Sequence, residues 1–281
     1  MTPVSTIRPW MVGAGNHEAN CIVDGSYADP FNNVTYISSE VCMPGQTNFT
    51  GYINHWRMPS DVSDGTGNFW YSFDHGMVHY IVLDMETDLG EGFIGPDDTG
   101  GVSGDIAGPF GAYPNAQRDW LESDLQSVDR TLTPWVIVSG HRPWYLSFAN
   151  TSSTICWSCK DVFEPLFIEY GVDLYLSGHA HFYQRSAPIA NGVIDPNELN
   201  NPSSPWYITN GAAGHYDGLS VGTAVPAPYE RFRLDENNST YGWSKLTFHN
   251  CTHMTHEFIN SSSSQAVDTA TLFKDRECIL F

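Results

Sequence analysis

The sequence predicts an α/β fold with a β-rich C-terminal region, and three observations support that prediction. The apolar runs 135–139 and 171–176 show no polar alternation, which is typical of strands covered on both faces. Between them, residues 162–170 carry apolar side chains at helical spacing. The stretch 242–273 instead contains segments in which apolar and polar residues alternate. A strand, a helix and a strand in succession predict a βαβ unit with parallel strands.

The composition is that of a globular protein with an acidic surface. Of the 281 residues, 41% are hydrophobic and 14% are aromatic, which is enough for a buried core. The 32 acidic and 12 basic residues give a formal net charge of −20. This charge disfavours anionic partners, so we predict no nucleic-acid and no membrane partner. No segment approaches the length of a membrane-spanning helix.

The first predicted strand leads into a polar turn. Residues 9–20 begin with a short apolar stretch and continue into a glycine turn that carries Asn16, His17 and Glu18. An asparagine carbonyl is an acceptable metal ligand, and the neighbouring imidazole can contact an oxyanion. A capped turn that begins a helix explains these residues equally well. Residues 21–67 are rich in Asn, Ser, Thr, Gly and Pro, which predicts long surface loops rather than regular structure.

Two strands and a helix are predicted next. The patterns 69–73 and 77–83 predict strands joined by a turn, and His79 is expected to pack within the second strand. Asp84 follows that strand and is a candidate site residue, although a carboxylate that accepts loop amides is the more ordinary role. Residues 117–128 have the apolar spacing of a helix that lies on a sheet.

Histidines follow both strands of the predicted βαβ unit. His141 follows the strand 135–139. His179 and His181 follow the strand 171–176 in a turn of small residues. Because crossover connections return the chain to the same end of a sheet, we expect these histidines at one sheet edge, where ligands of α/β proteins bind. Neutral imidazole is a common ligand of zinc and iron, and a His-x-His pair can reach two adjacent ions. Taken alone, such a pair is more often two loop histidines bonded to backbone.

The C-terminal part is predicted to contain further strands. A strand at 206–209 enters the glycine-rich loop 210–218, which is able to approach the same sheet edge. The remaining predicted strands are 242–248, 252–259 and 268–273. The histidines of this stretch are predicted to be surface residues of those strands: His249, His253 and His256.

Sequons and cysteines predict a secreted glycoprotein. Seven asparagines are followed two places on by Ser or Thr, with no proline between: Asn33, Asn48, Asn150, Asn237, Asn238, Asn250 and Asn260. The six cysteines allow 15 connectivities, of which pairing between sequence neighbours is the simplest: Cys21 with Cys42, Cys156 with Cys159, and Cys251 with Cys278. A redox or zinc role for Cys156 and Cys159 is the less favoured alternative, because one Cys-x-x-Cys cannot complete a zinc site. Secretory features without an opening signal peptide predict that an N-terminal part is missing.

Three motifs carry a resemblance to a known family. Their order is Gly-Asn-His-Glu from Gly15, Gly-His-Arg-Pro-Trp-Tyr from Gly140, and Gly-His-x-His-x-Tyr-x-Arg from Gly178. This order resembles that of the calcineurin-like metallophosphoesterases, specifically the large secreted purple acid phosphatases. The resemblance extends over nearly the whole chain and includes the loop 211–218 and the segment 241–246.

The resemblance implies a fold of two mixed β-sheets that form a sandwich flanked by helices, here N-terminally incomplete. Residues 1–235 are then the C-terminal portion of the catalytic domain. Residues 236–281 are the β-rich C-terminal region of the same domain.

The resemblance also implies an activity and a set of site residues. The family's acid phosphatases hydrolyse small phosphate monoesters by attack of metal-activated hydroxide at a dinuclear centre of Fe(III) and divalent Zn, Mn or Fe. Asn16, His141 and His179 are implied to bind the divalent metal, and His181 the iron. His17 is implied to contact the phosphoryl group or to protonate the leaving oxygen. Candidates for the substrate rim, each with a structural role as an equal alternative, are Arg142, Tyr183, Arg185 and His215.

One departure from the family pattern concerns the iron site. The family's Gly-Asp-x-Gly and Gly-Asp-x-x-Tyr motifs supply two aspartates and a tyrosine, and neither motif precedes Gly15 in this sequence. His181 is then the single protein ligand expected at the iron. We therefore expect the chain to be a C-terminal part of an acid phosphatase with an impaired iron site.

Two alternatives remain open. A phosphodiesterase or phytase-like member has the same dinuclear core, so the motifs do not distinguish it from a monoesterase. A secreted, non-catalytic glycoprotein domain that keeps the fold and binds at most one divalent ion is consistent with the missing bridging carboxylate. The natural substrate and the oligomeric state stay open.

Overall fold

The computed structural model describes residues 8–19, 26–29, 34–37, 49–86, 116–147, 154–214, 218–220, 225–234 and 239–277. The helical segments are α2 (Asn16–Ala19), α4 (Thr50–His55), the 3-10 helix η2 (Ser60–Val62), α5 (Ala116–Ser127) and α6 (Trp157–Glu169). The strands are β1 (Ser26–Asp29), β2 (Val34–Ile37), β3 (Tyr71–His75), β4 (Val78–Val82), β5 (Trp135–Ser139), β6 (Leu174–Ser177), β7 (Tyr183–Ser186), β8 (Ile189–Ala190), β9 (Val193–Ile194), β10 (Trp206–Asn210), β11 (Glu230–Arg233), β12 (Gly242–Phe248), β13 (His253–Asn260) and β14 (Ala266–Phe273).

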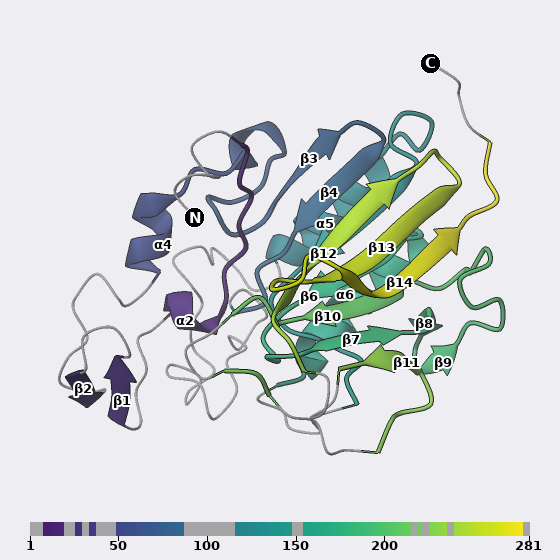
Figure 1. Ribbon diagram of the computed structural model, residues 1–281. Helices are drawn as coiled ribbons and strands as arrows, with labels where there is room; N and C mark the ends of the chain where they lie inside the picture. Colours follow the sequence, from purple (N-terminus) through teal and green to yellow (C-terminus); the bar gives the residue numbers. More distant parts are fainter. Residues whose placement is uncertain are drawn as a thin grey trace.

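A mixed sheet forms the centre of the fold (Figure 1). Within the described ranges it has seven strands in the order β11-β7-β10-β6-β5-β4-β3. β4, β5, β6 and β10 run parallel, whereas β3, β7 and β11 run antiparallel to their neighbours. β5 and β6 are adjacent, with Ile137 opposite Leu174. The predicted βαβ unit is therefore confirmed, and the loops that follow its two strands leave the sheet side by side.

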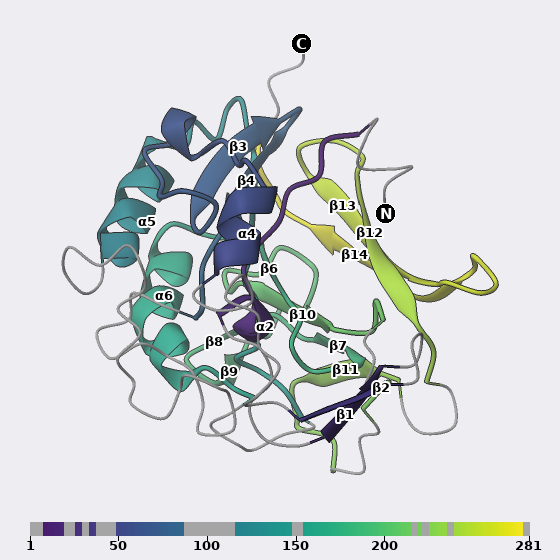
Figure 2. The same ribbon diagram turned by 90° about the vertical axis from the view of Figure 1, so that its left-hand side faces the viewer.

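Helices α5 and α6 cover one face of this sheet (Figure 2). Leu121 and Leu125 of α5 are buried against it together with Phe163 and Phe167 of α6. Full burial of each such side chain contributes about 1.5–3 kcal/mol to the stability of the fold. For this reason the helical spacing of apolar residues predicted both helices. No helix in the ranges given above is long and apolar enough to cross a membrane.

A second sheet, β12-β13-β14, covers the opposite face (Figure 2). Met254, Phe258 and Leu272 belong to the same buried cluster as Trp135 and Trp206 of the central sheet. The predicted sandwich of two sheets flanked by helices is confirmed, with the difference that all described pairs of the second sheet are antiparallel. The predicted division between residues 235 and 236 stays a prediction.

The histidines of the second sheet differ in burial. His249 and His253 are exposed, as predicted. The prediction for His256 is wrong, because its exposed fraction is 0%. β13 is the middle strand of its sheet, and alternate side chains of this strand face the central sheet. The ring of His256 accordingly stacks on that of Tyr183, with ring centroids 5.7 Å apart.

Residues 9–15 do not form the predicted strand. In this part of the described chain the backbone is held by side chains. The carbonyl of Val12 accepts hydrogen bonds from the hydroxyls of Tyr52 (3.2 Å) and Tyr71 (2.8 Å), and its N–H donates to the sulfur of Met58 (3.4 Å). These contacts satisfy backbone groups that a neighbouring strand would otherwise pair.

Residues 21–67 also differ from the prediction of loops alone. They include the antiparallel pair β1 and β2, and the helix α4. A composition rich in turn residues did not indicate these short elements.

The predicted disulfide between Cys156 and Cys159 is present, and both side chains are fully buried. The Cys156 sulfur accepts a hydrogen bond from the Cys159 N–H and caps α6. The helix therefore begins at Trp157, five residues before the stretch 162–170 that was predicted to be helical. Cys251 is disulfide-bonded as well, whereas Cys21, Cys42 and Cys278 lie outside the described residues.

Candidate metal centre

Three of the four predicted metal ligands lie in contact beyond the carboxyl ends of the parallel strands. His141 Nε2 is 2.8 Å from Asn16 Oδ1. His179 Nδ1 is 3.2 Å from the same oxygen and 3.0 Å from His141 Nε2. The two imidazole rings meet edge to face, with centroids 4.9 Å apart. All three side chains are half-buried, so a small ligand can reach them from solvent.

The pairing of β5 and β6 continues into the two loops that carry the histidines. The Gly140 N–H donates to the carbonyl of Leu176 (3.0 Å), and the Gly178 N–H donates to the carbonyl of His141 (2.9 Å). His179 has a φ of +62°, in the left-handed region. This conformation costs a non-glycine residue about 1–2 kcal/mol, and such strained residues cluster at functional sites.

Asn16 reaches the histidines because Gly15 approaches His141 closely. A Cβ atom at Gly15 would lie 2.9 Å from His141 Cε1, closer than real side chains tolerate. The Gly15 N–H donates to a carboxylate oxygen of Glu18 (2.8 Å), and the Glu18 N–H donates back to the Gly15 carbonyl (3.1 Å). This reciprocal turn begins α2 and holds Asn16 as its first residue.

The donor set of this cluster fits one divalent metal ion. Two ligand atoms that each lie about 2.1 Å from an ion are about 3.0 Å apart at a right angle and about 3.4 Å apart at the tetrahedral angle. The three separations of 2.8, 3.0 and 3.2 Å are close to that range. Two imidazole nitrogens and one amide oxygen are ligand types that zinc, manganese and iron all accept.

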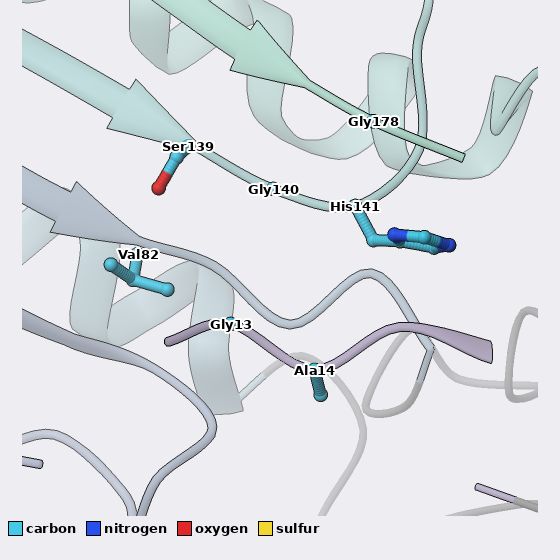
Figure 3. Close-up of a pocket in the computed structure, with 7 residues that line it drawn as sticks. All are labelled: Gly13, Ala14, Val82, Ser139, Gly140, His141 and Gly178. Atoms are coloured by element: carbon cyan, nitrogen blue, oxygen red, sulfur yellow. The ribbon is translucent and has the colours of Figure 1, made fainter. Parts of the chain in front are cut away.

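A cavity of about 190 Å³ opens beside His141 (Figure 3). Its lining is formed by Gly13, Ala14, Val82, Ser139, Gly140, His141 and Gly178. These residues come from four segments of the chain, and most of their side chains are small or absent. The volume is that of several water molecules at about 30 Å³ each.

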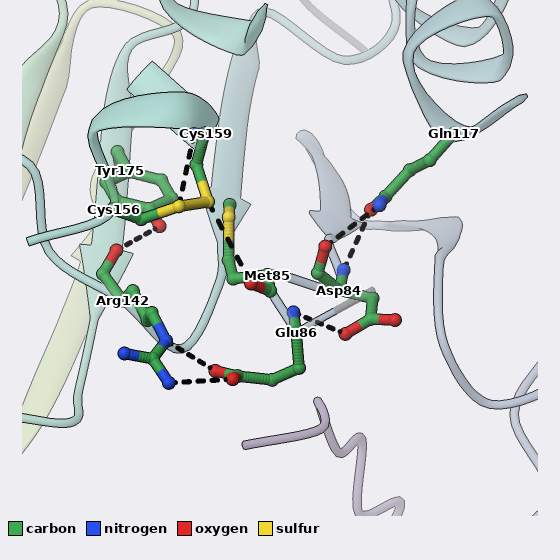
Figure 4. The surroundings of a disulfide bond; sticks show 8 residues. All are labelled: Asp84, Met85, Glu86, Gln117, Arg142, Cys156, Cys159 and Tyr175. Carbon is green, nitrogen blue, oxygen red and sulfur yellow. Dashed lines mark hydrogen bonds and ion pairs between the residues drawn. A yellow bond between two sulfur atoms is a disulfide. The ribbon is translucent and has the colours of Figure 1, made fainter. Parts of the chain in front are cut away.

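Arg142, predicted at the substrate rim, directly follows His141 in the sequence and is fully buried. Figure 4 shows its guanidinium facing the Glu86 carboxylate. Its Nε and Nη2 each lie 2.9 Å from one carboxylate oxygen of Glu86, which is also fully buried. The carbonyl of Arg142 accepts a hydrogen bond from the Tyr175 hydroxyl at 2.8 Å. Burial raises the pKa of Tyr175 well above its usual value, so this hydroxyl stays a donor. A substrate contact for Arg142 remains a prediction, and its placement favours the structural alternative.

Asp84 has the ordinary role considered for it. Its carboxylate accepts a hydrogen bond from the Glu86 N–H (2.9 Å). The side-chain amide of Gln117, in α5, pairs with both backbone groups of Asp84 at 2.8 Å. Glu86, Gln117 and Tyr175 were not predicted to lie near the centre. The available signal in the sequence was an acidic residue, Glu86, two positions after Asp84 and just beyond the predicted strand 77–83.

Tyr183 and Arg185, two other rim candidates, face the second sheet. The Tyr183 hydroxyl donates to Asp268 (2.6 Å), and Arg185 forms an ion pair with the same carboxylate (2.6 and 2.9 Å). Burial raises the pKa of Asp268, but the hydrogen bonds from Arg185 and Tyr183 outweigh it, so the pKa is lowered overall. Both residues thus join the two sheets.

The remaining predicted site residues are placed less completely. His181 is half-buried in the loop after His179, and its carbonyl accepts a hydrogen bond from the Ser220 N–H (2.9 Å). His17 is the second residue of α2, and its side chain lies outside the described part of the structure. His215 also lies outside it. Among the residues described, no group of three or more His, Cys, Asp or Glu side chains could hold a metal ion; the cluster above consists of two histidines and an asparagine.

Family models match most of the chain. Residues 3–183 match the model of the calcineurin-like phosphoesterases. Residues 204–269 match the model described as iron/zinc purple acid phosphatase-like protein C. The first match includes all three residues of the cluster, and the second includes most of the second sheet.

Sequence comparisons also identify acid phosphatases as relatives of the chain. The chain is 39% identical over 294 residues to acid phosphatase A of Cryphonectria parasitica, covering 98% of this chain and 54% of the relative. It is 27% identical over 271 residues to Fe(3+)-Zn(2+) purple acid phosphatase 12 of Arabidopsis thaliana, covering 92% of this chain and 47% of the relative. The chain thus spans about half the length of the curated relatives it matches.

A solved structure with a similar fold is purple acid phosphatase PPD1 from yellow lupin (Lupinus luteus) seeds. The TM-score is 0.68 at 22% sequence identity, and the match covers 95% of this chain and 41% of the lupin chain. At this sequence identity, the similarity shows a shared fold and nothing further.

Proposed function

Because the chain belongs to the family of calcineurin-like phosphoesterases, we propose that it contributes the divalent-metal site of an acid phosphatase that hydrolyses small phosphate monoesters. The single observation that carries this proposal is the convergence of Asn16, His141 and His179 within 2.8–3.2 Å of one another. A relative of 39% identity named acid phosphatase A supports the choice of substrate class.

The proposed centre is dinuclear, with Fe(III) and a divalent zinc, manganese or iron ion. A relative named for Fe(3+) and Zn(2+) supports this choice. Asn16 Oδ1, His141 Nε2 and His179 Nδ1 hold the divalent ion in this proposal, and His181 binds the iron. When bound, the metals lower the pKa of water, polarise the phosphoryl oxygens and neutralise developing charge. Because the chain carries a formal charge of −20, the metals and histidines also supply the positive potential that attracts a phosphate ester.

His17 has the proposed role of a proton donor to the leaving oxygen. It directly follows Asn16 in α2, so a ligand of the metal and an acid group occupy adjacent positions. An imidazole transfers a proton efficiently at mildly acidic pH, because its unperturbed pKa is about 6.5.

Secretion and N-glycosylation are part of the proposal. The buried disulfide of Cys156 and Cys159 supports an oxidising compartment. Asn250 is exposed in the turn between β12 and β13, where the Thr252 hydroxyl donates to its side-chain oxygen (2.8 Å). This sequon is accessible for modification.

A second candidate function is the binding of a single divalent ion without catalysis. It is favoured by the observation that, across the described ranges, no group of three acidic, histidine or cysteine side chains could hold a metal ion. One ion held by Asn16, His141 and His179 would lack the second metal of a phosphatase centre.

The test combines metal content with hydrolysis of a chromogenic phosphomonoester at about pH 5, near the range suited to an imidazole acid. A diester of the same chromophore is measured in parallel. His141→Ala serves as the variant without a site, and the exposed His249→Ala as its matched control. Two metals per chain and monoester hydrolysis, lost only in His141→Ala, would support the phosphatase. One metal without hydrolysis would support the second candidate, and faster diester hydrolysis would point to a phosphodiesterase. Metal content equal in the wild-type chain and in His141→Ala would overturn the proposed site.

A further inference from the structure

We propose that the buried ion pair of Glu86 and Arg142 is a positioning element of the metal centre, which fixes the backbone that carries His141. The inference rests on the proposed function in one respect, since it takes the cluster of Asn16, His141 and His179 to be a metal site. Neither Glu86 nor Arg142 belongs to that cluster. Both act on the metal site through His141, which precedes Arg142 in the sequence.

The geometry of the pair restricts both partners. Two parallel hydrogen bonds of 2.9 Å join the guanidinium to the two carboxylate oxygens, and both side chains have an exposed fraction of 0%. A bidentate fork of this kind fixes the direction as well as the distance of the guanidinium. Removing two charges from water costs several kcal/mol per ion, so a buried pair is weak evidence for a purely stabilising role.

The Glu86 side of the pair is anchored to the helical layer. The carboxylate of Asp84 accepts the Glu86 N–H, and Gln117 of α5 pairs with both backbone groups of Asp84. The exit of β4 is thereby tied to α5 before the chain reaches Glu86. Glu86 therefore offers Arg142 a fixed carboxylate rather than a mobile one.

The Arg142 side is coupled to the histidine loops. The Arg142 carbonyl is held by the Tyr175 hydroxyl of β6, and the His141 carbonyl is held by the Gly178 N–H. On the other side of His141, a Cβ atom at Gly140 would lie 2.5 Å from Met85 Cε and 2.8 Å from the Tyr175 hydroxyl. The loop thus packs tightly on the segment that bears Glu86. A displacement of Arg142 would move His141 out of its 2.8 Å contact with Asn16.

A second buried carboxylate provides the matched control. Asp173 has a side-chain exposed fraction of 0% and forms ion pairs with Arg130 (3.0 Å) and Arg276 (2.6 Å). It lies immediately before β6, whereas His179 follows the other end of the same strand. Asp173→Asn therefore removes an equally buried negative charge from an ion network at the opposite edge of the sheet.

The experiment measures Zn²⁺ affinity of the full chain by competition with a chromophoric chelator, together with urea unfolding of each variant. The variants are Glu86→Gln, Arg142→Lys, the control Asp173→Asn, and His141→Ala as the chain without a site. The double variant Glu86→Gln/Arg142→Met removes both charges, so it leaves no uncompensated ion if a single variant fails to fold.

We expect Glu86→Gln, Arg142→Lys and the double variant to bind Zn²⁺ about 10–100-fold more weakly, the range found when contacts outside the ligand shell are lost. Asp173→Asn should lose stability but keep the wild-type affinity. The inference is overturned if the affinity of the double variant equals that of the wild-type chain, or if affinity falls as far in Asp173→Asn. Wild-type affinity no greater than that of His141→Ala would instead overturn the metal site itself and, with it, this inference.

Discussion

His79 Nε2 lies 2.9 Å from a carboxylate oxygen of Asp124, which joins β4 to the helix α5. The other ring nitrogen of His79 lies 2.7 Å from Asp74. Because both nitrogens face carboxylate oxygens, the ring must carry two protons to donate to both. Burial lowers the pKa of His79, but the hydrogen bonds and charges of Asp124 and Asp74 outweigh it, so the pKa is raised above 6.5.

Because of this raised pKa, we expect protonation of His79 to stabilise the folded protein. The stabilisation is complete below the unfolded-state pKa of about 6.5 and is lost as the pH rises through the higher folded-state value. We expect His79→Gln to cost about 1.5–3 kcal/mol at acidic pH, typical of hydrogen bonds to charged groups, and less at alkaline pH. Urea unfolding on both sides of the transition measures this, with the exposed His253→Gln as control. An equal cost at both pH values would contradict the prediction.

His256 has the opposite dependence on pH. Burial between the two sheets lowers its pKa from 6.5 to about 4, so the folded protein holds the neutral imidazole. The charged groups around it are Asp268, Arg185 and Glu257. Its contribution to stability is present above the unfolded-state pKa and is lost as the pH falls from 6.5 to about 4.

His256→Phe should therefore flatten the acid side of the stability curve. At about 1.4 kcal/mol for each tenfold change in proton affinity, the wild-type chain should lose up to roughly 3 kcal/mol relative to the variant across that pH range. Unfolding free energies at several acidic pH values test this. A constant difference between the two proteins would show that the imidazole does not titrate as expected.

Asn16 is expected to act through its side-chain oxygen. Asn16→Ala removes a donor atom from the cluster, whereas Asn16→Asp retains an oxygen and adds a charge that hard cations favour. We expect Asn16→Ala to weaken Zn²⁺ binding by more than the roughly 10–100-fold cost of losing an outer contact, and Asn16→Asp to keep or increase the affinity. Calorimetric titration of both variants gives the comparison. Equal Zn²⁺ affinities of Asn16→Ala and the wild-type chain would mean that Asn16 is not a ligand.

Gly15→Ala tests the close approach of the turn to His141. The added methyl would lie 2.9 Å from His141 Cε1 and 3.1 Å from a carboxylate oxygen of Glu18, so one of these groups must shift. We expect weaker Zn²⁺ binding with little loss of global stability, because the strain falls on the half-buried cluster. Gly76→Ala is the control: its φ of +58°, unlike that of Gly15, strains an alanine, but no heavy atom lies within 4 Å of its added Cβ. Tight binding by Gly15→Ala would contradict the described contact.

The sequence predicted the residues of the histidine cluster better than the residues that surround it. The βαβ unit placed His141 and His179 at one sheet edge because the direction of parallel strands follows from chain order alone. Glu86 and Arg142 lie 56 positions apart, and no local pattern reveals such a pair. His256 was predicted to be exposed because an imidazole in an alternating strand is usually a surface residue. Its burial depends on which face meets the central sheet, a property of the packed fold.

The N-terminal segment shows a similar limit. Its apolar residues suggested a strand, yet the carbonyl of Val12 is satisfied by two tyrosine hydroxyls. Hydrophobicity indicates which backbone is extended and buried. It does not indicate whether a strand or side chains will supply the hydrogen bonds.

The contacts between Asn16, His141 and His179 also imply an order of assembly during folding. His141 and His179 are 38 positions apart, within one βαβ unit, whereas Asn16 is 163 positions from His179. Closing the longer loop costs about 1 kcal/mol more in chain entropy, and contacts distant in sequence form more slowly. We therefore expect the histidine pair to form first and the docking of Asn16 to complete the cluster, so that tight metal binding appears only once the N-terminal segment has met the βαβ unit.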